Sequence, residues 1–402
     1  MRRSTIAVLT LALTATTAAP ASAAPASAAP ASAATGPTWR QFDVPVEGGT
    51  NILSVSATGR DDAWAGGLVL RDDGGTPTPK PPAMRRSSVT NDDECASQGM
   101  FSSLMLHWDG RAWKKVALPE VGRVNQVSAS SASDVWASAD CALLHWDGHA
   151  WSRVPYEPIP GAQQSGNEAV KAVTARDAWM TGSTYDSVTQ VERGFVQHWD
   201  GRRWRNVPLP KLGDSFGLDG IDARGPDDAW AVGTDTTKND TQPEGVILLH
   251  WDGRVWKRVP APDTGEWTNR VTRVRMASGS DVWVSGMGKR SPAWEEIRRP
   301  LLLHWDGRAW TTAKVPDGRG ELNDVAVSGG HALAAGDTFA PSMPDYTSFT
   351  LRRTATGWEE TTSPVSGTAA VEGLSPIPGG GLWSVGVSGD DEHMRPFIAR
   401  SN

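Results

Sequence analysis

The residues of this chain that are best suited to chemistry stand together at 248–260, in the segment LLHWDGRVWKRVP. His250 and Asp252 could exchange a proton, as a general base and a carboxylate do. Trp251 and Trp256 flank them and could stack on a ligand. In isolation the segment therefore fits two kinds of site, an acid–base centre or an aromatic binding platform.

The segment is one copy of a repeat, which changes its interpretation. Five equivalent histidines spread around a ring could not converge on one substrate, so we expect a structural role for them. We also expect the repeated tryptophans to pack between repeats, since burial of one ring contributes a few kcal/mol. The other copies are LMLHWDGRAWKKV from Leu104, ALLHWDGHAWSRV from Ala142, FVQHWDGRRWRNV from Phe195, LLLHWDGRAWTTA from Leu301 and the divergent FTLRRTATGWEET from Phe349.

A second motif of the type DVWAVG accompanies the first and recurs at intervals of roughly 50 residues. A segment such as VNQVSA (124–129) comes before it in each unit, so each repeat supplies four strands. Four-stranded units at this period are typical of propeller blades. Copies of the second motif stand at 61–67, 133–139, 176–182, 227–233, 280–286, 330–336 and 380–386.

The Asp-Gly pair between the last two strands predicts a two-residue hairpin with a type I′ turn. Both faces of the resulting hairpin are largely apolar, as expected for a sheet packed between two neighbours. The predicted register pairs Trp251 with Arg254, His250 with Val255 and Leu249 with Trp256.

The repeats predict an all-β chain that folds as one seven-bladed β-propeller of four-stranded antiparallel blades, over residues 38–402. The last repeat has only three strands before the chain ends. TWRQFDVP at 38–45 matches the fourth-strand segment AWKRVPAP. We therefore expect residues 39–44 to complete the last blade beside 396–400, which closes the ring and removes an exposed sheet edge.

The N-terminal segment predicts secretion to the extracellular space. Residues 1–23 have the charged start, apolar stretch and small-residue cleavage signal of a signal peptide, and 24–37 form a Pro/Ala-rich leader. Cys95 and Cys141 are then predicted to form a disulfide. The net charge of −7 argues against nucleic acid. No later segment is predicted to span a membrane, and no metal site or cofactor is expected.

Two regions of the predicted propeller could bind a ligand. One face carries tight, uniform turns, and the other carries long loops of variable length, where recognition usually resides. Two of the 20 tryptophans, Trp267 and Trp294, fall outside the repeat on the variable face. The aromatic residues predicted to contact a ligand there are Trp267, Trp294, Tyr156, Tyr185, Phe216 and Tyr346.

The propeller axis is the other candidate region. A polar ring at the inner strands could bind an ion or a sugar, or could line a water-filled channel, and we favour the lining. Asp219 and Glu372 are the carboxylates that a glycosidase would need, although nothing in the sequence indicates their separation. The predicted ring comprises Leu53, Asn125, Lys171, Asp219, Thr272, Asn323 and Glu372, with Arg273 and Asp324 nearby.

The pattern DVWAVG followed by LLHWDGxxW resembles the repeats of secreted seven-bladed propellers of bacteria, especially actinobacteria. W-D-G-R-x-W is also loosely similar to the Asp-box of sialidase propellers, which has an extra residue between Asp and Gly. In that family the Asp-box is structural, and the sialidase arginine triad has no counterpart here. The tryptophan-rich repeats resemble those of propeller lectins in architecture.

These observations favour a secreted, non-enzymatic recognition protein. It would bind an extracellular carbohydrate or a protein partner through the variable face, as a lectin-like protein or a subunit of a larger assembly. No catalytic motif is present in the sequence, so no catalytic residue is predicted under this hypothesis. The alternatives are a glycoside hydrolase or lyase that uses Asp219 and Glu372, and a structural scaffold.

Overall fold

The computed structural model describes residues 36–46, 48–70, 101–119, 121–140, 142–160, 165–237, 245–291, 297–328, 330–338, 346–389 and 394–402. The predicted signal peptide, nearly all of the leader, the predicted Cys95–Cys141 disulfide and Trp294 lie outside these residues. Every regular element within the described ranges is a β-strand. The compact unit spans Gly36–Asn402.

Four of the sheets consist of four consecutive antiparallel strands each. The first has β2 (Thr50–Gly59), β3 (Asp62–Leu70), β4 (Phe101–Trp108) and β5 (Trp113–Lys115). The second has β6 (Val124–Ser131), β7 (Asp134–Ala139), β8 (Ala142–Trp146) and β9 (Trp151–Val154). The third has β18 (Thr268–Ser278), β19 (Asp281–Lys289), β20 (Arg299–Trp305) and β21 (Trp310–Thr312). The fourth has β22 (Glu321–Ser328), β23 (His331–Thr338), β24 (Thr347–Thr354) and β25 (Gly357–Thr361).

A larger sheet of eight strands contains the same four-strand order twice. Its two halves are joined by one parallel pair, Arg193 with Phe216. The first half has β10 (Ser165–Thr174), β11 (Asp177–Asp186), β12 (Val191–Trp199) and β13 (Trp204–Asn206). The second half has β14 (Phe216–Gly225), β15 (Asp228–Asp235), β16 (Gly245–Trp251) and β17 (Trp256–Arg258).

The last sheet joins the two ends of the chain. It has β26 (Ala369–Pro376), β27 (Leu382–Ser388) and β28 (Arg395–Ser401), and its outer strand is β1 (Trp39–Phe42). β1 pairs antiparallel with β28, with Trp39 opposite Ser401. The prediction that the N-terminal strand completes the last four-stranded unit is therefore confirmed.

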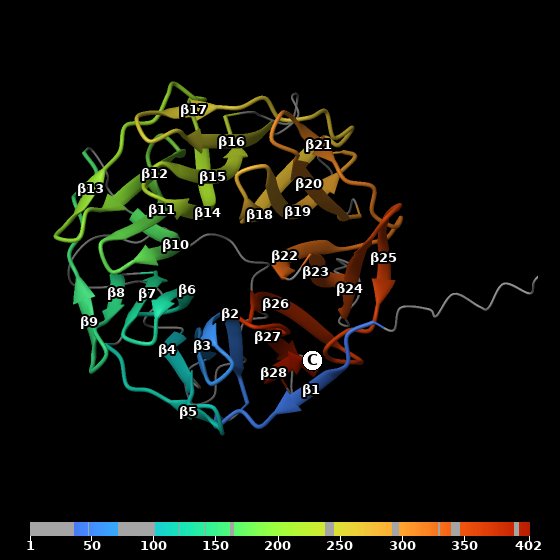
Figure 1. Cartoon of the computed structure of the whole chain (residues 1–402). Coiled ribbons are helices and arrows are strands. Elements are labelled where there is room, and N and C mark those ends of the chain that lie inside the picture. The colour runs from blue at the N-terminus through green and yellow to red at the C-terminus, as the bar shows by residue number, and fades with distance from the viewer. Residues whose placement is uncertain are drawn as a thin grey trace, which may run out of the picture. The chain divides into compact units, whose positions relative to one another are not determined.

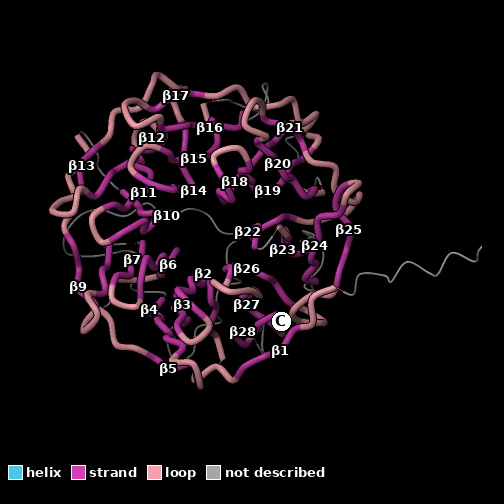
Figure 2. Tube along the Cα trace, in the orientation of Figure 1, coloured by secondary structure: helices cyan, strands magenta, loops and turns pink. Residues whose placement is uncertain are grey.

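The first strands of these units lie innermost and contact one another in cyclic order (Figures 1 and 2). β2, β6, β10, β14, β18, β22 and β26 each contact the next, and β26 contacts β2. We number as blades 1 to 7 the four-strand groups that begin at these strands, in this order. The predicted all-β propeller of four-stranded antiparallel blades is confirmed.

Tryptophans pack the blades against one another. The buried ring of Trp64, on the second strand of blade 1, lies 5.0 Å from Trp146 and 5.4 Å from Trp151 of blade 2. The predicted packing role of the repeated tryptophans is therefore confirmed. The equivalent sets are Trp136 with Trp199 and Trp204, Trp179 with Trp251 and Trp256, and Trp230 with Trp305 and Trp310.

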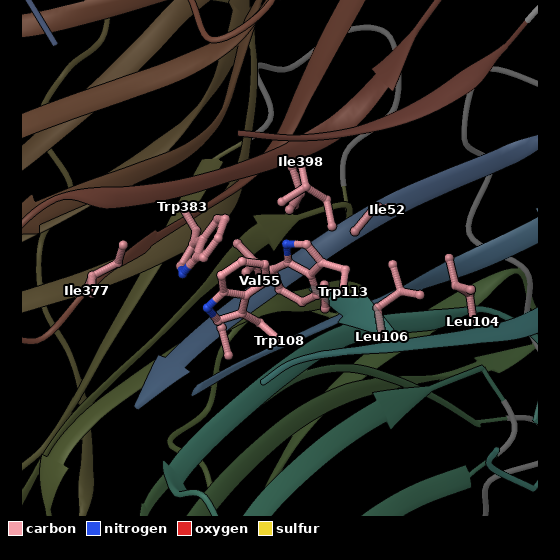
Figure 3. Close-up of a cluster of buried hydrophobic side chains, with 12 residues drawn as sticks. Ile52, Val55, Leu104, Leu106, Trp108, Trp113, Ile377, Trp383 and Ile398 are labelled. Carbon is pink, nitrogen blue, oxygen red and sulfur yellow. The ribbon is translucent and has the colours of Figure 1, made fainter. Parts of the chain in front are cut away.

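The junction of blades 7 and 1 has the same kind of tryptophan set (Figure 3). Trp383 of blade 7 lies 5.4 Å from Trp108 and 5.2 Å from Trp113 of blade 1. The junction of blades 6 and 7 differs, because Leu333 occupies the place of the second-strand tryptophan and packs near Trp39. This junction is therefore the one with the smallest aromatic interface.

Candidate functional site

The Asp-Gly turn of the repeat is ordered by its own carboxylate. The amide N–H groups of Arg254 and Val255 each donate to Asp252 Oδ1 at 3.0 Å. Gly253 has a φ of 86°, in the left-handed region that suits glycine. A hydrogen bond from Lys257 and, after it, these two backbone bonds lower the pKa of Asp252, so this carboxylate is poorly suited to act as a base.

The predicted two-residue hairpin is wrong, because the turn contains four residues, 252–255. An aspartate that accepts two backbone amides stabilises this longer turn, as in Asx-turns. The same bonds form at Asp109, Asp147, Asp200 and Asp306. The observed register places Trp251 opposite Trp256, His250 opposite Lys257 and Leu249 opposite Arg258.

The repeated histidine pairs with an aspartate of the preceding motif. His250 Nε2 lies 3.0 Å from Asp228 Oδ1, and its ring lies 4.7 Å from that of Trp230. Each of the five copies belongs to a different blade, so the predicted structural role fits this geometry. The other pairs are His107 with Asp62, His145 with Asp134, His198 with Asp177 and His304 with Asp281.

The side chains at the propeller axis are set by a recurring β-bulge. In every inner strand, one residue near the start has no partner in the ladder to the second strand. A bulge re-aims the side chain of the extra residue and is typical of functional regions. The bulge residues are Leu53, Asn125, Glu168, Asp219, Thr272, Asn323 and Glu372.

The bulges correct one member of the predicted axial ring. Glu168, not Lys171, occupies the bulge of β10, between Asn167 and Ala169. Lys171 pairs in the ladder with Trp179, and its Nζ lies 2.8 Å from Asp222 Oδ1 of blade 4. The prediction failed because VKAV (170–173) has the same spacing of valines as VNQV (124–127), whereas the bulge register makes Val170 the counterpart of Val127.

Side chains just beyond the bulges hold neighbouring blades together. Asp324 of blade 6 accepts hydrogen bonds from Arg275 of blade 5 at 2.7 Å and from the Leu374 N–H of blade 7 at 3.0 Å. Such bonds satisfy inner-strand amides that have no ladder partner. A second set of bonds between blades has its acceptor three residues after the bulge: Ser56 for Ala129 N–H, Ser128 for Ala172 N–H, Asp222 for Met276 N–H and Ser375 for Ala57 N–H.

Blade 2 carries an ion pair next to its bulge. Arg123 Nη2 lies 3.1 Å from Asp140 Oδ1, and the bulge residue Asn125 donates to the same oxygen at 3.2 Å. Asn125 also donates to the Asn167 carbonyl of blade 3 at 2.9 Å. The bulge amide therefore joins its own blade to the next one.

Blade 6 repeats this arrangement with a like-charged pair. Glu321 stands opposite Asp337 in the β22–β23 ladder. The bulge residue Asn323 donates to Asp337 Oδ2 and to the Val371 carbonyl of blade 7, both at 2.9 Å. Arg298 Nη1 lies 2.8 Å from Glu321 Oε2.

Burial is the main cause of the raised pKa values of two carboxyl groups in this region. It raises the pKa of Asp337 to about 8, and the charges of Glu321 and Glu372 add to the effect. Burial also raises the pKa of Glu372, against a hydrogen bond from Asn51 Nδ2 at 3.1 Å. A protonated carboxyl group can donate a hydrogen bond, which a carboxylate cannot.

Arg273 places a guanidinium among these groups. Burial lowers its pKa, whereas the negative charges of Asp324, Glu372 and Glu168 raise it. Within the described residues no hydrogen bond or ion pair engages Arg273. A guanidinium that is not engaged by the described residues has its N–H donors available for carbonyl or carboxylate oxygens of a ligand.

The aromatic residues predicted to bind a ligand lie on different blades. Tyr156 packs in the cluster of blades 2 and 3, and Phe216 is buried at 7% exposure. The Tyr185 hydroxyl bonds to Gln190, and the Tyr346 hydroxyl lies 3.5 Å from Met394 Sδ. Trp267 precedes β18, where its N–H donates to the Lys289 carbonyl at 2.6 Å. Phe216 is therefore not presented to a ligand, because it belongs to the core.

The carboxylates nominated for glycoside hydrolysis, Asp219 and Glu372, occupy the bulges of blades 4 and 7. Among the described side chains, no group of three or more His, Cys, Asp or Glu residues could hold a metal ion. No helix in the described part of the chain is long and apolar enough to cross a membrane.

Sequence reasoning missed five residues of this region: Glu168, Arg123, Asp140, Glu321 and Asp337. Arg123 and Glu321 stand two positions before the bulge, Arg123 just before β6 and Glu321 at the start of β22. Asp140 follows the end of β7, and Asp337 is the next-to-last residue of β23. Their charges were visible in the sequence. Their pairing depends on the bulge register, which the repeat pattern does not reveal.

The fold and the axial ring define a β-propeller whose inner strands present polar and charged side chains. No family model matches the chain, and no curated protein matches it. Among solved structures it is similar to YCF48 from Cyanidioschyzon merolae, at 12% identity and a TM-score of 0.51, over 90% of this chain and 98% of that chain. A structure described as YCF48 bound to D1 peptide has 13% identity and a TM-score of 0.52, over 90% and 94%. The likeness shows the propeller fold.

Proposed function

We propose that this protein is a protein-binding propeller that receives a peptide segment of its partner at the axial bulge ring. The bulge positions are the observation that carries the proposal. The tryptophans and turn aspartates repeat almost unchanged from blade to blade, as packing requires. The bulge residues instead differ in charge and polarity, from Leu53 to Asn125 and Glu168.

A ring of this kind suits a peptide because the peptide backbone has both donors and acceptors. Arg273 offers donors for peptide carbonyls, and Glu168 and Asp219 offer acceptors for peptide N–H groups. A rigid scaffold with varied side chains is the usual arrangement for recognition. The D1 peptide in the similar YCF48 structure gives this hypothesis further support, since it shows that a propeller of related fold takes a peptide.

We further infer a seven-bladed ring in which the eight-stranded sheet counts as two blades and β1 closes the last one. Support comes from the repeated strand order in that sheet and from the β1–β28 pairing. The extracellular location and bacterial origin inferred from the N-terminal segment and repeats remain part of the proposal. A glycan ligand and carboxylate catalysis remain alternatives that the experiment below would detect.

The test is selection of binding peptides from a displayed library on the purified chain 36–402. We expect enriched peptides whose affinity falls at least tenfold in Arg273→Met and in Thr272→Glu. Thr272 is exposed, so its substitution changes the ring with little effect on packing. Arg254→Met, on the tight-turn face, is the control and should bind like the wild type.

Two results would contradict the proposal. One is the absence of any enriched peptide. The other is enrichment of peptides that bind both ring variants as well as they bind the wild type. A parallel glycan array with Trp267→Ala separates the alternatives, since sugar binding lost in that variant would favour a lectin. Product release from a polysaccharide, lost in Glu372→Gln, would favour an enzyme.

A further inference from the structure

The cross-strand position two residues before the bulge differs between blades in a way that the propeller fold does not require. In the described blades, only two pairs at this position combine two ionisable side chains. Blade 2 has Arg123 with Asp140, and blade 6 has Glu321 with Asp337. Opposite charges across a ladder stabilise a sheet, and like charges directly opposite destabilise it.

The surroundings of the blade 6 pair compensate its two carboxyl groups unequally. Arg298 Nη1 lies 2.8 Å from Glu321 Oε2. Its charge also lowers the pKa of Asp337, but burial and the charges of Glu321 and Glu372 outweigh it there. Asp337 is 7% exposed and accepts only the neutral Asn323 amide among its described hydrogen bonds. The third carboxyl group nearby, Glu372 on β26, bonds to Asn51 and adds repulsion. A buried charge that is only partly compensated is costly, and protonation removes that cost.

The pair also lies where two blades meet. Asn323 joins the Asp337 carboxyl group to the Val371 carbonyl of blade 7 through one amide. This is the junction where Leu333 replaces the packing tryptophan, so fewer aromatic contacts oppose a separation of the two blades. A negative charge created on Asp337 would face both Glu321 and Glu372 at this junction.

We propose that Asp337 carries the proton of a carboxyl pair with Glu321, and that loss of this proton loosens the junction between blades 6 and 7. The junction between blades 6 and 7 then depends on pH, and raised pH favours separation of these two blades. This inference does not depend on the identity of a ligand or on peptide binding.

The sign of the pH dependence follows from the raised pKa of Asp337. Between the ordinary aspartate value near 4 and about 8, the folded chain holds a proton that the unfolded chain has released. The free energy of unfolding therefore falls as pH rises through this window. The fall ends above the pKa that Asp337 has in the folded chain. A single proton changes the unfolding equilibrium constant by up to about tenfold per pH unit.

The test measures the unfolding equilibrium of the chain 36–402 in urea between pH 5 and 9. Asp337→Asn keeps an amide at the position and removes the titration, so its stability should lack the wild-type decline. Asp140→Asn is the matched control in blade 2. It keeps the Glu321–Asp337 pair and should show the wild-type decline from a lower starting stability. An Asp337→Asn variant with the full wild-type decline would overturn the proposal.

Amide hydrogen exchange tests whether the loosening is confined to the junction between blades 6 and 7. Wild type and Asp337→Asn are compared at pH 9, where the same intrinsic exchange rates apply to both. We expect faster wild-type exchange in β22, β23 and β26 and equal exchange in β6, β7 and β10. Equal exchange everywhere, or an increase spread over all blades, would contradict a loosening at the junction between blades 6 and 7.

A second variant keeps the proposal testable if Asp337→Asn does not fold. Glu321→Gln removes the opposing charge, so the Asp337 proton is lost at lower pH. The pH at which the stability decline ends should then move down by at least half a pH unit, whereas an unchanged end would show that the two carboxyl groups are not coupled.

Discussion

Trp383 offers the sharpest test of how the ring is closed. Its side chain is fully buried between blades 7 and 1. Trp108, Trp113 and Phe42 surround it with ring centroids at 5.2–5.4 Å, and the Arg400 guanidinium lies 5.3 Å from its ring. Trp383→Ala therefore removes the centre of a cluster that joins the first and last blades (Figure 3).

The expected cost follows from burial. Replacement of a fully buried tryptophan by alanine typically costs about 3–5 kcal/mol. Because Phe42 of β1 loses one of its partners, β1 should also separate from β28 more readily than in the wild type. Urea unfolding gives the total cost, and hydrogen exchange in β1 and β28 reports the local one.

Trp146→Ala is the matched control. Trp146 packs against Trp64 in the same kind of junction, but its side chain is only partly buried and its Nε1 bonds to the Ala132 carbonyl. We expect a cost of about 1–2 kcal/mol, and no change in exchange at β1. The reasoning fails if Trp383→Ala is no more costly than this control, or if β1 keeps its protection.

Three further outcomes follow from the structure. Gly253→Val should cost about 1–3 kcal/mol in urea unfolding without changing peptide binding, because Gly253 has a φ of 86° and an added Cβ would meet Asp227 Oδ1 at 2.8 Å. Asp324→Ala should cost about 3–5 kcal/mol, because it leaves the Arg275 guanidinium without its carboxylate, and Asp252→Ala on the exposed turn should cost less. Although burial raises the pKa of Asp62, hydrogen bonds from His107 and Thr58 give a net lowering, so its contribution is complete above pH 4 and disappears as pH falls further. In thermal unfolding between pH 2 and 5, the Tm of Asp62→Asn should therefore fall less with decreasing pH than the Tm of the wild type. An equal fall would refute the stabilising role of the Asp62 carboxylate.

The propeller could be predicted because its information is local and repeated. Each copy of the DVWAVG and HWDG motifs specifies the same strands and the same turn, so five good copies compensate for two divergent ones. The missing fourth strand of the last repeat and the matching segment at 38–45 identified the strand that completes the last four-stranded sheet, which the β1–β28 pairing bears out.

The candidate site could be predicted only in part. The bulge positions of six blades were recognised as axial from their place in the repeat, as the second position of the inner strand. Lys171 was assigned in place of Glu168, since the valine spacing of 170–173 imitates that of 124–127 and only the ladder shows that Val170 corresponds to Val127. Phe216 was assigned to the surface, although it is the first residue of a buried inner strand.

The hairpin shows the same limit on a smaller scale. An Asp-Gly pair predicts a two-residue turn from backbone preference alone. In the folded chain the Asp252 carboxylate accepts two amides and extends the turn to four residues, which moves Trp256 opposite Trp251. A side chain that competes for backbone amides thus decides the register.

The sequence by itself determined the strands, the blade repeat, the packing tryptophans and the strand that closes the ring, because neighbouring residues and their spacing encode these features. Only the tertiary structure decided which charges meet. Arg123 faces Asp140, whereas Glu321 faces Asp337 and approaches Glu372 from the next blade. The physical reason is that burial and charge proximity depend on distances across strands and blades, which a bulge of one residue is enough to change.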